Sequence, residues 1–464
     1  MTTAQEPGLA RSPGLSYQEL LDADTHEVPK VLREQSPRFL GDEDVSIDHY
    51  ISREWFEREK ERLWARVWQM ACREEHIPRP GDYTLYEIVG KSFLIVRVDE
   101  STIKAYPNAC LHRGRQLKQY DGWCEEIRCP FHGFAWNPDG SLKDVPAAWD
   151  LPHVTPENFA LPEVKVGTWG GFVFINPDPD AGPLEDFIGG LADHFERWNL
   201  TDRYVQAHVA KEIRANWKIA QEAFCEAFHV NATHPQILPY IGDTNSQVDV
   251  WDTYSRVITP AATPSPLLGW TPDEETILRY ALDVRVDEEL FITIKEGQTA
   301  RAAMADATRD RWRPVVGTII DEWSDAEMVD NLDYTLFPNF HPWGAFNRIV
   351  YRFRPNGDDH RTAIMEVFFL APFKGERPPP APIHRLGVDE PWTEAPELGV
   401  LAKVFEQDTF NMARVQLGLE STRKPGITLA NYQESKVRWS HQLLEEWMSD
   451  EPGKDEAGKP GQGG

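Results

Sequence analysis

The chain has 464 residues, of which 41% are hydrophobic, so it is long enough for two domains with separate cores. Its formal net charge of −27 argues against nucleic acid and anionic membranes as partners. No run approaches the roughly 18 apolar residues that a transmembrane helix needs, and the N-terminus lacks the apolar core of a signal peptide. Five cysteines are too few for a disulfide scaffold, so we expect a cytoplasmic protein.

The first part of the chain predicts an arm, a helix and a small β domain. Residues 1–40 are polar, with a short helix expected at 17–21, and residues 52–67 have the apolar spacing of an amphipathic helix. Short β-like runs separated by polar turns follow, which indicates an antiparallel domain. The expected strands lie at 82–88, 92–98 and 102–106, and a closing strand pair lies at 164–176.

A linker rich in Pro and Asp at 177–183 introduces the second half. Residues 270–330 carry little core signal and predict a lid or an insertion over a pocket. The expected helices are 184–198, 216–230 and 397–420, and the expected strands are 208–213, 333–337, 347–354 and 363–371. The predicted organisation is an arm at 1–50, a cluster-binding domain at 51–177, a larger domain at 178–450 and a disordered tail at 451–464.

The stretch 110–132 contains two similar halves, each with one thiol and one imidazole. Cys110 and His112 form the first half, and Cys129 and His132 form the second. Two such halves can hold a [2Fe–2S] cluster with sulfur ligands on one iron and nitrogen ligands on the other, which is the Rieske arrangement. The alternative is a structural zinc site. Zinc sites usually pair like ligands with like, so the mixed halves favour the cluster.

A second group of metal-ligating residues lies in the predicted helix at 216–230. Two His and one carboxylate are the ligands of non-haem Fe(II) oxygenases, and His229 and His234 are the candidate imidazoles. Because they are five residues apart, the helix must loosen after His229 or end before Pro235. Glu226 precedes His229 by three residues and is expected on the same helix face. Alternatively, these His are ordinary core or surface residues.

The third ligand is expected from the last predicted helix, where Asp408 interrupts an apolar face. A buried carboxylate needs a partner, and a metal ion is a suitable one; the alternative is a salt-bridged Asp. Glu406 points to the other side and is a poorer candidate. Glu222, one turn before Glu226, is either a second buried acid or solvated. The spacing predicts that this apolar face consists of Leu401, Val404, Met412, Val415 and Leu419.

These motifs resemble those of a known family. CLHRG followed by CPFHGFAWNPDGSL resembles the Rieske domain of non-haem iron oxygenases that attack aromatic rings. The patterns E-x-x-H-x4-H and D-x7-Q-x-G-L resemble the catalytic motifs of the aromatic-ring-hydroxylating dioxygenase alpha subunits. The resemblance implies an α+β fold, in which an N-terminal all-β Rieske domain is followed by a helix-grip catalytic domain with an antiparallel sheet wrapped round helices.

The resemblance also implies the cofactors and the roles of the site residues. Each subunit would hold one [2Fe–2S] cluster and one mononuclear Fe(II). Glu226 would be the bridging carboxylate that links the iron's ligand shell to a cluster His in a neighbouring subunit. The implied cluster ligands are Cys110, His112, Cys129 and His132, and the implied ligands of the mononuclear iron are His229, His234 and Asp408.

The implied function is the terminal oxygenase of a ring-hydroxylating system. It would use O2 to hydroxylate an aromatic or bulky hydrophobic substrate, with electrons from NADH through a reductase and a ferredoxin. The head-to-tail electron path implies a homotrimer, with or without a small beta subunit. Many dioxygenases carry Asp at position 226, whereas Glu occurs in members that oxidise quaternary amines. Phe228 occupies a position that is often Tyr.

Two alternative functions therefore remain. One is a monooxygenase that performs O- or N-demethylation, or hydroxylates an alicyclic or steroid ring. The other is an electron-transfer protein without oxygenase activity, which the size of the second domain disfavours. The motifs are nearly silent on the substrate. Four candidate pocket residues are equally interpretable as core: Phe224, Ile237, Leu238 and Phe346.

Overall fold

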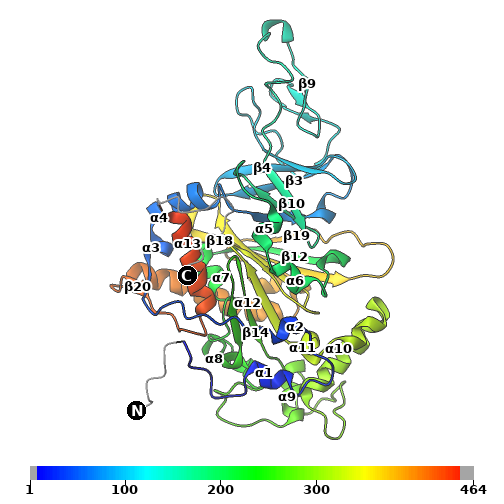
Figure 1. The fold of residues 1–464 in the computed structure, drawn as a ribbon, viewed down its shortest axis with the longest axis vertical. Coiled ribbons are helices and arrows are strands. Elements are labelled where there is room, and N and C mark those ends of the chain that lie inside the picture. Colours follow the sequence, from blue (N-terminus) through cyan, green and yellow to red (C-terminus); the bar gives the residue numbers. More distant parts are fainter. Residues whose placement is uncertain (1–7, 450–464) are drawn as a thin grey trace. The chain divides into compact units, whose positions relative to one another are not determined.

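The computed structural model describes residues 8–449, which divide into two compact units. One unit comprises residues 56–187 with 355–359, and the other comprises 8–55, 188–354 and 360–449. Each unit combines strands and helices, and the predicted α+β class is confirmed (Figure 1). The predicted limits of the arm and of the two domains remain predictions. The tail predicted to be disordered, 451–464, lies outside the described residues.

The smaller unit is built from short strands in three sheets, ordered β5-β4-β3-β6, β10-β11-β2 and β7-β8-β9. In β3 every second residue is buried, as expected for a strand with one face on a core. The predicted strand pair at 164–176 is an antiparallel hairpin turned by two glycines. The strands are β2 (Gln69–Arg73), β3 (Asp82–Ile88), β4 (Lys91–Arg97), β5 (Ile103–Pro107), β6 (Gly122–Trp123), β7 (Ile127–Arg128), β8 (Ala135–Trp136), β9 (Leu142–Asp144), β10 (Lys165–Trp169) and β11 (Phe172–Asn176).

The larger unit is organised by one sheet of eight strands, ordered β13-β14-β15-β16-β17-β18-β12-β19. Strand β12 pairs antiparallel with β18 over almost its whole length and parallel with β19. The strands are β12 (Arg203–Ile213), β13 (Gln247–Val250), β14 (Tyr254–Thr259), β15 (Asn331–Leu336), β16 (Phe340–Pro342), β17 (Ile349–Asn356), β18 (Asp359–Pro372) and β19 (Ile383–Leu386), with β1 (Val45–Ser46) and β20 (Gly426–Ile427) pairing separately.

Two long helices pack on this sheet. Helix α12 (Leu401–Ser421) contacts β12 and the short helix α7 (Trp217–Glu222), and α13 (Ser435–Met448) contacts β13 and β14. No helix of residues 8–449 is both long and apolar enough to cross a membrane. The other α-helices are α1 (Tyr17–Leu21), α2 (Lys30–Arg33), α3 (Asp48–Ile51), α4 (Arg53–Arg58), α5 (Leu184–Ile188), α6 (Leu191–Phe195), α8 (Val230–Thr233), α9 (Glu274–Leu282), α10 (Ala300–Val316) and α11 (Asp325–Val329).

Two of the long helices expected from the sequence are wrong. The helix expected at 184–198 is broken into α5 and α6 by two glycines, of which Gly189 has a φ of 51°. The helix expected at 216–230 ends at Glu222, and α8 begins only at Val230. The intervening backbone forms turns, and this break positions the candidate metal ligands.

The last part of the chain differs from expectation in two further ways. The buried face of α12 comprises Ala402, Phe405, Asp408, Met412 and Gln416, so Asp408 is buried as predicted. The apolar face expected around it is wrong in part, because Val415 is 48% exposed. Helix α13 was not predicted. The helix expected at 52–67 spans 53–63, and its second half is a π-helix.

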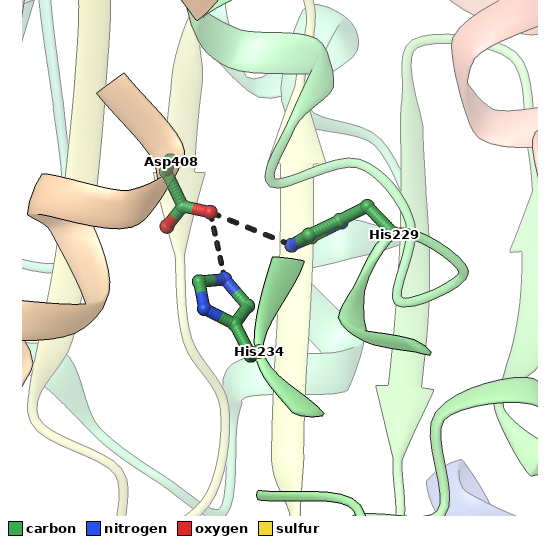
Figure 2. Close-up of side chains that lie close together, drawn as sticks. All are labelled: His229, His234 and Asp408. Carbon is green, nitrogen blue, oxygen red and sulfur yellow. Dashed lines mark hydrogen bonds and ion pairs between the residues drawn. The ribbon is translucent and has the colours of Figure 1, made fainter. Parts of the chain in front are cut away.

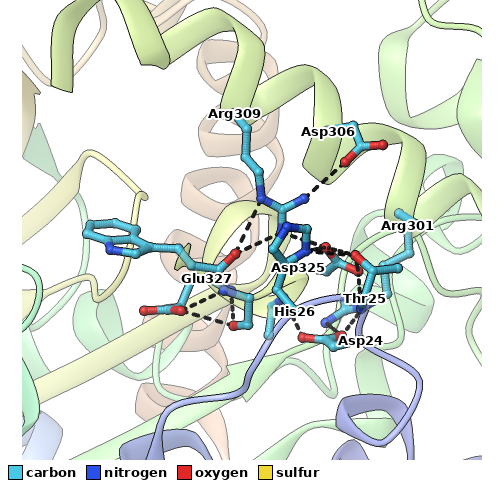
Figure 3. A network of polar contacts seen from close by, with 12 residues as sticks. Asp24, Thr25, His26, Arg301, Asp306, Arg309, Asp325 and Glu327 are labelled. Atoms are coloured by element: carbon cyan, nitrogen blue, oxygen red, sulfur yellow. Dashed lines mark hydrogen bonds and ion pairs between the residues drawn. The ribbon is translucent and has the colours of Figure 1, made fainter. Parts of the chain in front are cut away.

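Residues 24–26 are anchored by a polar network (Figure 3). Thr25 Oγ1 donates to Asp325 Oδ1 over 2.9 Å, and Arg309 binds the same carboxylate over 2.6 Å. Arg301 lies 3.4 Å from Asp24. Because Arg301 and Arg309 belong to α10, the network joins the N-terminal segment to the region that was expected to be a lid.

Candidate metal centres

The two cysteine loops of the smaller unit have the same backbone construction. Cys110 N–H donates to Arg115 O over 2.8 Å, and Cys129 N–H donates to Phe134 O over 2.8 Å. Both cysteines are buried in the core cluster of this unit. Burial is the main cause that raises the pKa of the Cys110 thiol, and the neighbouring Cys129 thiol raises it further. The loops therefore bring the two sulfur atoms together.

The two imidazoles that were predicted as cluster ligands also come together. The rings of His112 and His132 lie 4.7 Å apart between centroids. His112 Nδ1 is buried and has no hydrogen-bond partner in the described part of the chain. The outer nitrogen of the second ring, His132 Nε2, lies 3.0 Å from the Arg113 guanidinium. Two adjacent thiols and a buried imidazole nitrogen without a hydrogen-bond partner fit the donor set of a Rieske cluster.

The zinc alternative fits these loops less well. One tetrahedral zinc ion would draw its four ligand atoms to within about 4 Å of one another. Within residues 8–449, the only group of three or more His, Cys, Asp or Glu whose ligand atoms converge in this way is in the larger unit. The cysteine loops thus offer pairs of donors and not a single-ion cage, as a two-iron cluster requires.

The converging group in the larger unit consists of His229, His234 and Asp408 (Figure 2). Asp408 Oδ1 lies 2.7 Å from His234 Nε2 and 3.6 Å from His229 Nε2. The His flank the one-turn helix α8, and His234 leaves the helical region with φ −127° and ψ 53°. The expected break before Pro235 is therefore confirmed. The convergence of the three side chains is present, although their role as iron ligands remains a proposal.

The other nitrogen of each ring is held by an oxygen acceptor. His229 Nδ1 donates to Glu226 Oε1 over 2.7 Å, because a carboxylate can only accept. His234 Nδ1 lies 2.8 Å from Gln407 Oε1, which also accepts from Gln236 Nε2 over 2.8 Å. With its proton on Nδ1, each ring can offer the Nε2 lone pair to a metal ion, and both Nε2 atoms converge with the Asp408 carboxylate. Two nitrogen donors and one oxygen donor that converge in this way fit a metal ion.

The same carboxylate of Glu226 also holds the backbone. Its Oε2 accepts the His229 N–H over 2.9 Å. The expectation that Glu226 and His229 share a helix face is wrong, because neither lies in a helix, but their contact exists through this turn. Burial lowers the pKa of His229, and the carboxylates of Glu226 and Asp408 outweigh burial, so that the pKa is raised. The site is therefore strongly attractive to positive charge.

The structure shows the surroundings of three other residues that the sequence analysis discussed, Glu222, Glu406 and Phe228. Glu222 is mostly buried, with 15% of its side chain exposed; it accepts from Tyr50 and contacts His441, and burial raises its pKa to about 8. Glu406 faces away from the site and accepts the Trp392 N–H over 2.9 Å. Phe228 is 45% exposed. Sequence reasoning missed Gln407, whose only signal is its place directly before Asp408.

The candidate pocket residues fall in different surroundings. Phe224 stacks with Phe353 and packs at a tilt against Tyr351, and the pKa of Tyr351 is raised by burial and by the charges of Asp333 and Asp408. This aromatic group is therefore close to the candidate metal ligands. Phe346 instead packs against two tryptophans, Trp312 and Trp323. Leu238 is buried, and Ile237 is half-buried.

Comparison with protein families gives two matches that together cover most of the chain. Residues 67–155 match the Rieske [2Fe–2S] domain, and residues 194–450 match the ring hydroxylating alpha subunit (catalytic domain). Solved structures of Rieske oxygenases share the fold. A quaternary ammonium Rieske monooxygenase in complex with L-carnitine has a TM-score of 0.62 at 18% identity, covering 88% of this chain and 96% of that one. A naphthalene 1,2-dioxygenase variant bound to phenanthrene has a TM-score of 0.62 at 19% identity, covering 89% and 93%.

Curated relatives match over shorter segments. The carnitine monooxygenase oxygenase subunit of Acinetobacter baumannii is 31% identical over 40% of this chain and 51% of its own length. The chlorobenzene dioxygenase subunit alpha of Cupriavidus sp. strain PS12 is 30% identical over 42% and 43%. The glycine betaine monooxygenase oxygenase subunit of Chromohalobacter salexigens is 29% identical over 48% of each. The chain therefore spans about half the length of these relatives.

Proposed function

Because this chain belongs to the family of ring-hydroxylating alpha subunits, with a Rieske domain ahead of the catalytic domain, we propose that it is the terminal oxygenase of a multicomponent system. Of the two oxygenase functions expected from the sequence, we propose the monooxygenase in place of the aromatic-ring dioxygenase. The carnitine and glycine betaine monooxygenases among the relatives support this choice, as does Glu at position 226. The proposed substrates are small quaternary amines. The chlorobenzene dioxygenase relative keeps an aromatic substrate as the second candidate.

The proposed reaction inserts one oxygen atom into a C–H bond. It is R–H + O2 + 2 electrons + 2 protons → R–OH + water, with NADH as the electron source through a reductase and a ferredoxin. When bound, the cluster transfers single electrons and the mononuclear iron activates O2. An electron-transfer protein would need only the first of these cofactors.

The residues of this chain supply ligands, orientation and exclusion of water. His229, His234 and Asp408 would hold the mononuclear iron on one side and leave the other positions open. Glu226 and Gln407 fix the two rings with Nε2 forward. The aromatic side chains near Asp408 limit the access of water. In the smaller unit, the two thiols and two imidazoles would hold the cluster.

The observation that carries this proposal is the convergence of two imidazoles and one carboxylate, in which the Nδ1 of each imidazole is already engaged. We expect anaerobically purified protein to contain about three irons for two acid-labile sulfides per chain, as one cluster plus one mononuclear site requires. A ratio of two to two that added Fe(II) does not raise would favour the electron-transfer protein.

Labelled oxygen distinguishes the two oxygenase functions. With 18O2, NADH and a reductase, a monooxygenase places one labelled atom in the product, whereas a dioxygenase places two in a cis-diol. We expect one labelled atom with carnitine or glycine betaine, and no turnover of chlorobenzene. A neutral isostere, with carbon in place of the quaternary nitrogen, is the matched control for recognition of the substrate's charge. Two labelled atoms in a cis-diol would overturn the monooxygenase proposal.

The assembly and the location stay proposals that follow from the family. A homotrimer, with or without a small beta subunit, would place a cluster of one subunit near Glu226 of the next. The cytoplasmic location is consistent with five cysteines that are all free and buried. Mass measurement of the purified protein tests the assembly directly.

A further inference from the structure

A line of buried titratable side chains connects the surface of α13 with the inner end of α7. Glu445, on α13, is 57% exposed, and its Oε1 lies 3.5 Å from His49 Nε2. His49 Nδ1 lies 2.9 Å from His441 Nδ1. His441 Nε2 lies 2.8 Å from Glu222 Oε1. Both rings are at most 3% exposed, so the line runs through the interior.

The atoms are ordered as proton transfer requires. Each imidazole is contacted at one nitrogen from the outer side and at its other nitrogen from the inner side, so a proton accepted at the first can leave from the second. One proton must lie between the two Nδ1 atoms, since two lone pairs or two N–H groups would repel at 2.9 Å. Tyr50 offers a parallel branch, because its hydroxyl lies 2.7 Å from His441 Nε2 and donates to Glu222 Oε2 over 3.0 Å.

The inner end lies close to the candidate metal centre. Glu222 is the last residue of α7 and precedes Glu226, the anchor of His229, by four positions. Glu434 is half-buried and lies near both carboxylates, because its pKa is raised to about 7, first by burial and then by the charges of Glu226 and Glu222. The side chains of Glu222, Glu226 and His229 are 15%, 9% and 25% exposed, so each of them is accessible to water.

We propose that Glu445, His49, His441 and Glu222 form a proton-uptake chain that carries protons from solvent to the surroundings of Glu226 and His229. This inference rests on the proposed oxygenase function, whose reaction consumes two protons for every two electrons. Electrons that arrive through the cluster bring no protons, so the protons must reach a buried site separately. Glu222 is the inner store and Glu445 the outer entry.

The groups that face Glu222 explain why it can hold a proton near neutral pH. Burial disfavours its ionised form most, while the Tyr50 hydroxyl and the charge of Lys218 favour it, which leaves the pKa at about 8. Glu434 adds a second negative group from the segment before α13, and His441 faces Glu222 from α13 itself. Below this pKa the carboxyl is protonated and can release a proton inward, then reload through His441.

Infrared spectroscopy of the resting full chain tests the relay without turnover. We expect a carbonyl band of a protonated carboxyl at pH 7 that is absent in Glu222→Gln. After mixing with D2O, this band should shift at least several-fold more slowly in His49→Phe than in the wild type. Phe preserves the stacking of residue 49 on Trp55, where the ring centroids are 3.9 Å apart. An unchanged shift rate in His49→Phe would overturn the proposal.

Turnover supplies the second test. It includes a variant of the exposed Glu445, whose substitution is not expected to disturb folding. We expect Glu222→Gln to lower kcat at least tenfold while the cluster spectrum and the iron content stay unchanged. Glu445→Gln should lower kcat about twofold and raise its solvent isotope effect, whereas Glu446→Gln, an exposed neighbour on the same helix, should not. Imidazole in the buffer should restore His49→Ala. If the variants lose iron together with activity and imidazole does not restore activity, these side chains have only a structural role, and the proposal is overturned.

If the wild type fails to oxygenate quaternary amines, the proposed function is wrong, while the infrared experiment still tests the proton relay independently.

Discussion

Histidines contribute to both candidate iron sites, but the ring nitrogen that is available to a metal ion differs: it is Nδ1 in the cysteine loops and Nε2 in the larger unit. In the cysteine loops, His112 Nδ1 is the buried atom without a partner, and the outer Nε2 of His132 is the atom near Arg113. In the larger unit, Nδ1 of both rings is engaged and Nε2 faces Asp408. The hydrogen bond made by one ring nitrogen therefore selects the nitrogen that is left for metal.

The two sites also differ in what holds their rings. Each loop of the smaller unit is fixed by backbone hydrogen bonds at its cysteine and by a glycine with positive φ. The mononuclear site relies on side chains instead, a charged Glu226 behind one ring and a neutral Gln407 behind the other. One site should thus be sensitive to backbone changes and the other to side-chain changes.

Removing a ligand gives the largest expected effect and separates the sites. His229→Ala should lower the iron content by about one per chain and abolish turnover, because two protein ligands do not hold Fe(II) in an oxygenase site. The visible spectrum of the cluster should remain unchanged. Intact turnover in His229→Ala would contradict the assignment of His229 as a ligand.

A substitution in the cysteine loops should remove the cluster and leave the mononuclear site intact. Cys129→Ser should remove the cluster and its visible colour while the protein still binds about one Fe(II) per chain. Iron analysis and absorption spectra on the same sample make the measurement. If Cys129→Ser also loses the mononuclear iron, the two sites do not assemble independently.

Changes behind the rings should have intermediate effects. Gln407→Leu removes the acceptor of His234 Nδ1, frees the ring to rotate and should weaken Fe(II) binding by about 10- to 100-fold. Gln407→Glu restores an acceptor oxygen and should bind Fe(II) more tightly than Gln407→Leu. Equilibrium competition with a chelator gives both affinities. Equal affinities for the two variants would show that the hydrogen bond of Gln407 is unimportant.

Backbone changes in the cysteine loops should give the smallest effects. Gly114 and Gly133 have φ of +73° and +87°, so an added Cβ costs about 1 kcal/mol at each position. At Gly133 the Cβ would also lie 3.3 Å from Pro146 Cγ, while nothing lies within 4 Å at Gly114. Gly133→Ala should therefore lose cluster absorbance at a lower temperature than Gly114→Ala. The reverse order would exclude this contact as the cause.

The sequence predicted the components of the sites better than their local backbone. The four cluster residues lie within 23 positions of one another, so their spacing alone indicated one site. Asp408 lies 174 positions from His234 and was identified because a carboxylate on a buried helix face needs a partner. The break between Glu222 and Val230 was placed too late, because the stretch has good helix formers, whereas the Glu226 side chain binds the backbone and the ring of His229 in a turn.

Other misses have the same origin. Gln407 was not identified, since an amide beside a carboxylate carries no signal until the fold places it behind a ring. Glu222 could not be assigned to core or solvent, because its partners Tyr50 and His441 lie 172 and 219 positions away in the chain. Periodicity identifies the buried face of an element, but contacts between distant elements decide what a polar group there does.

The carboxylate of Glu226 limits how readily one oxygenase could be converted into another. Its two oxygens accept two different hydrogen bonds, one from the backbone amide of His229 and one from the imidazole of the same residue. Replacing Glu by Asp draws both oxygens back by about one methylene, so the substituted side chain cannot satisfy the turn and the ring together. A protein engineer who exchanges this residue between quaternary-amine and aromatic-ring oxygenases would have to redesign the loop 223–229 with it. Because this residue and the loop must change together, we expect position 226 to change slowly when one oxygenase evolves into another.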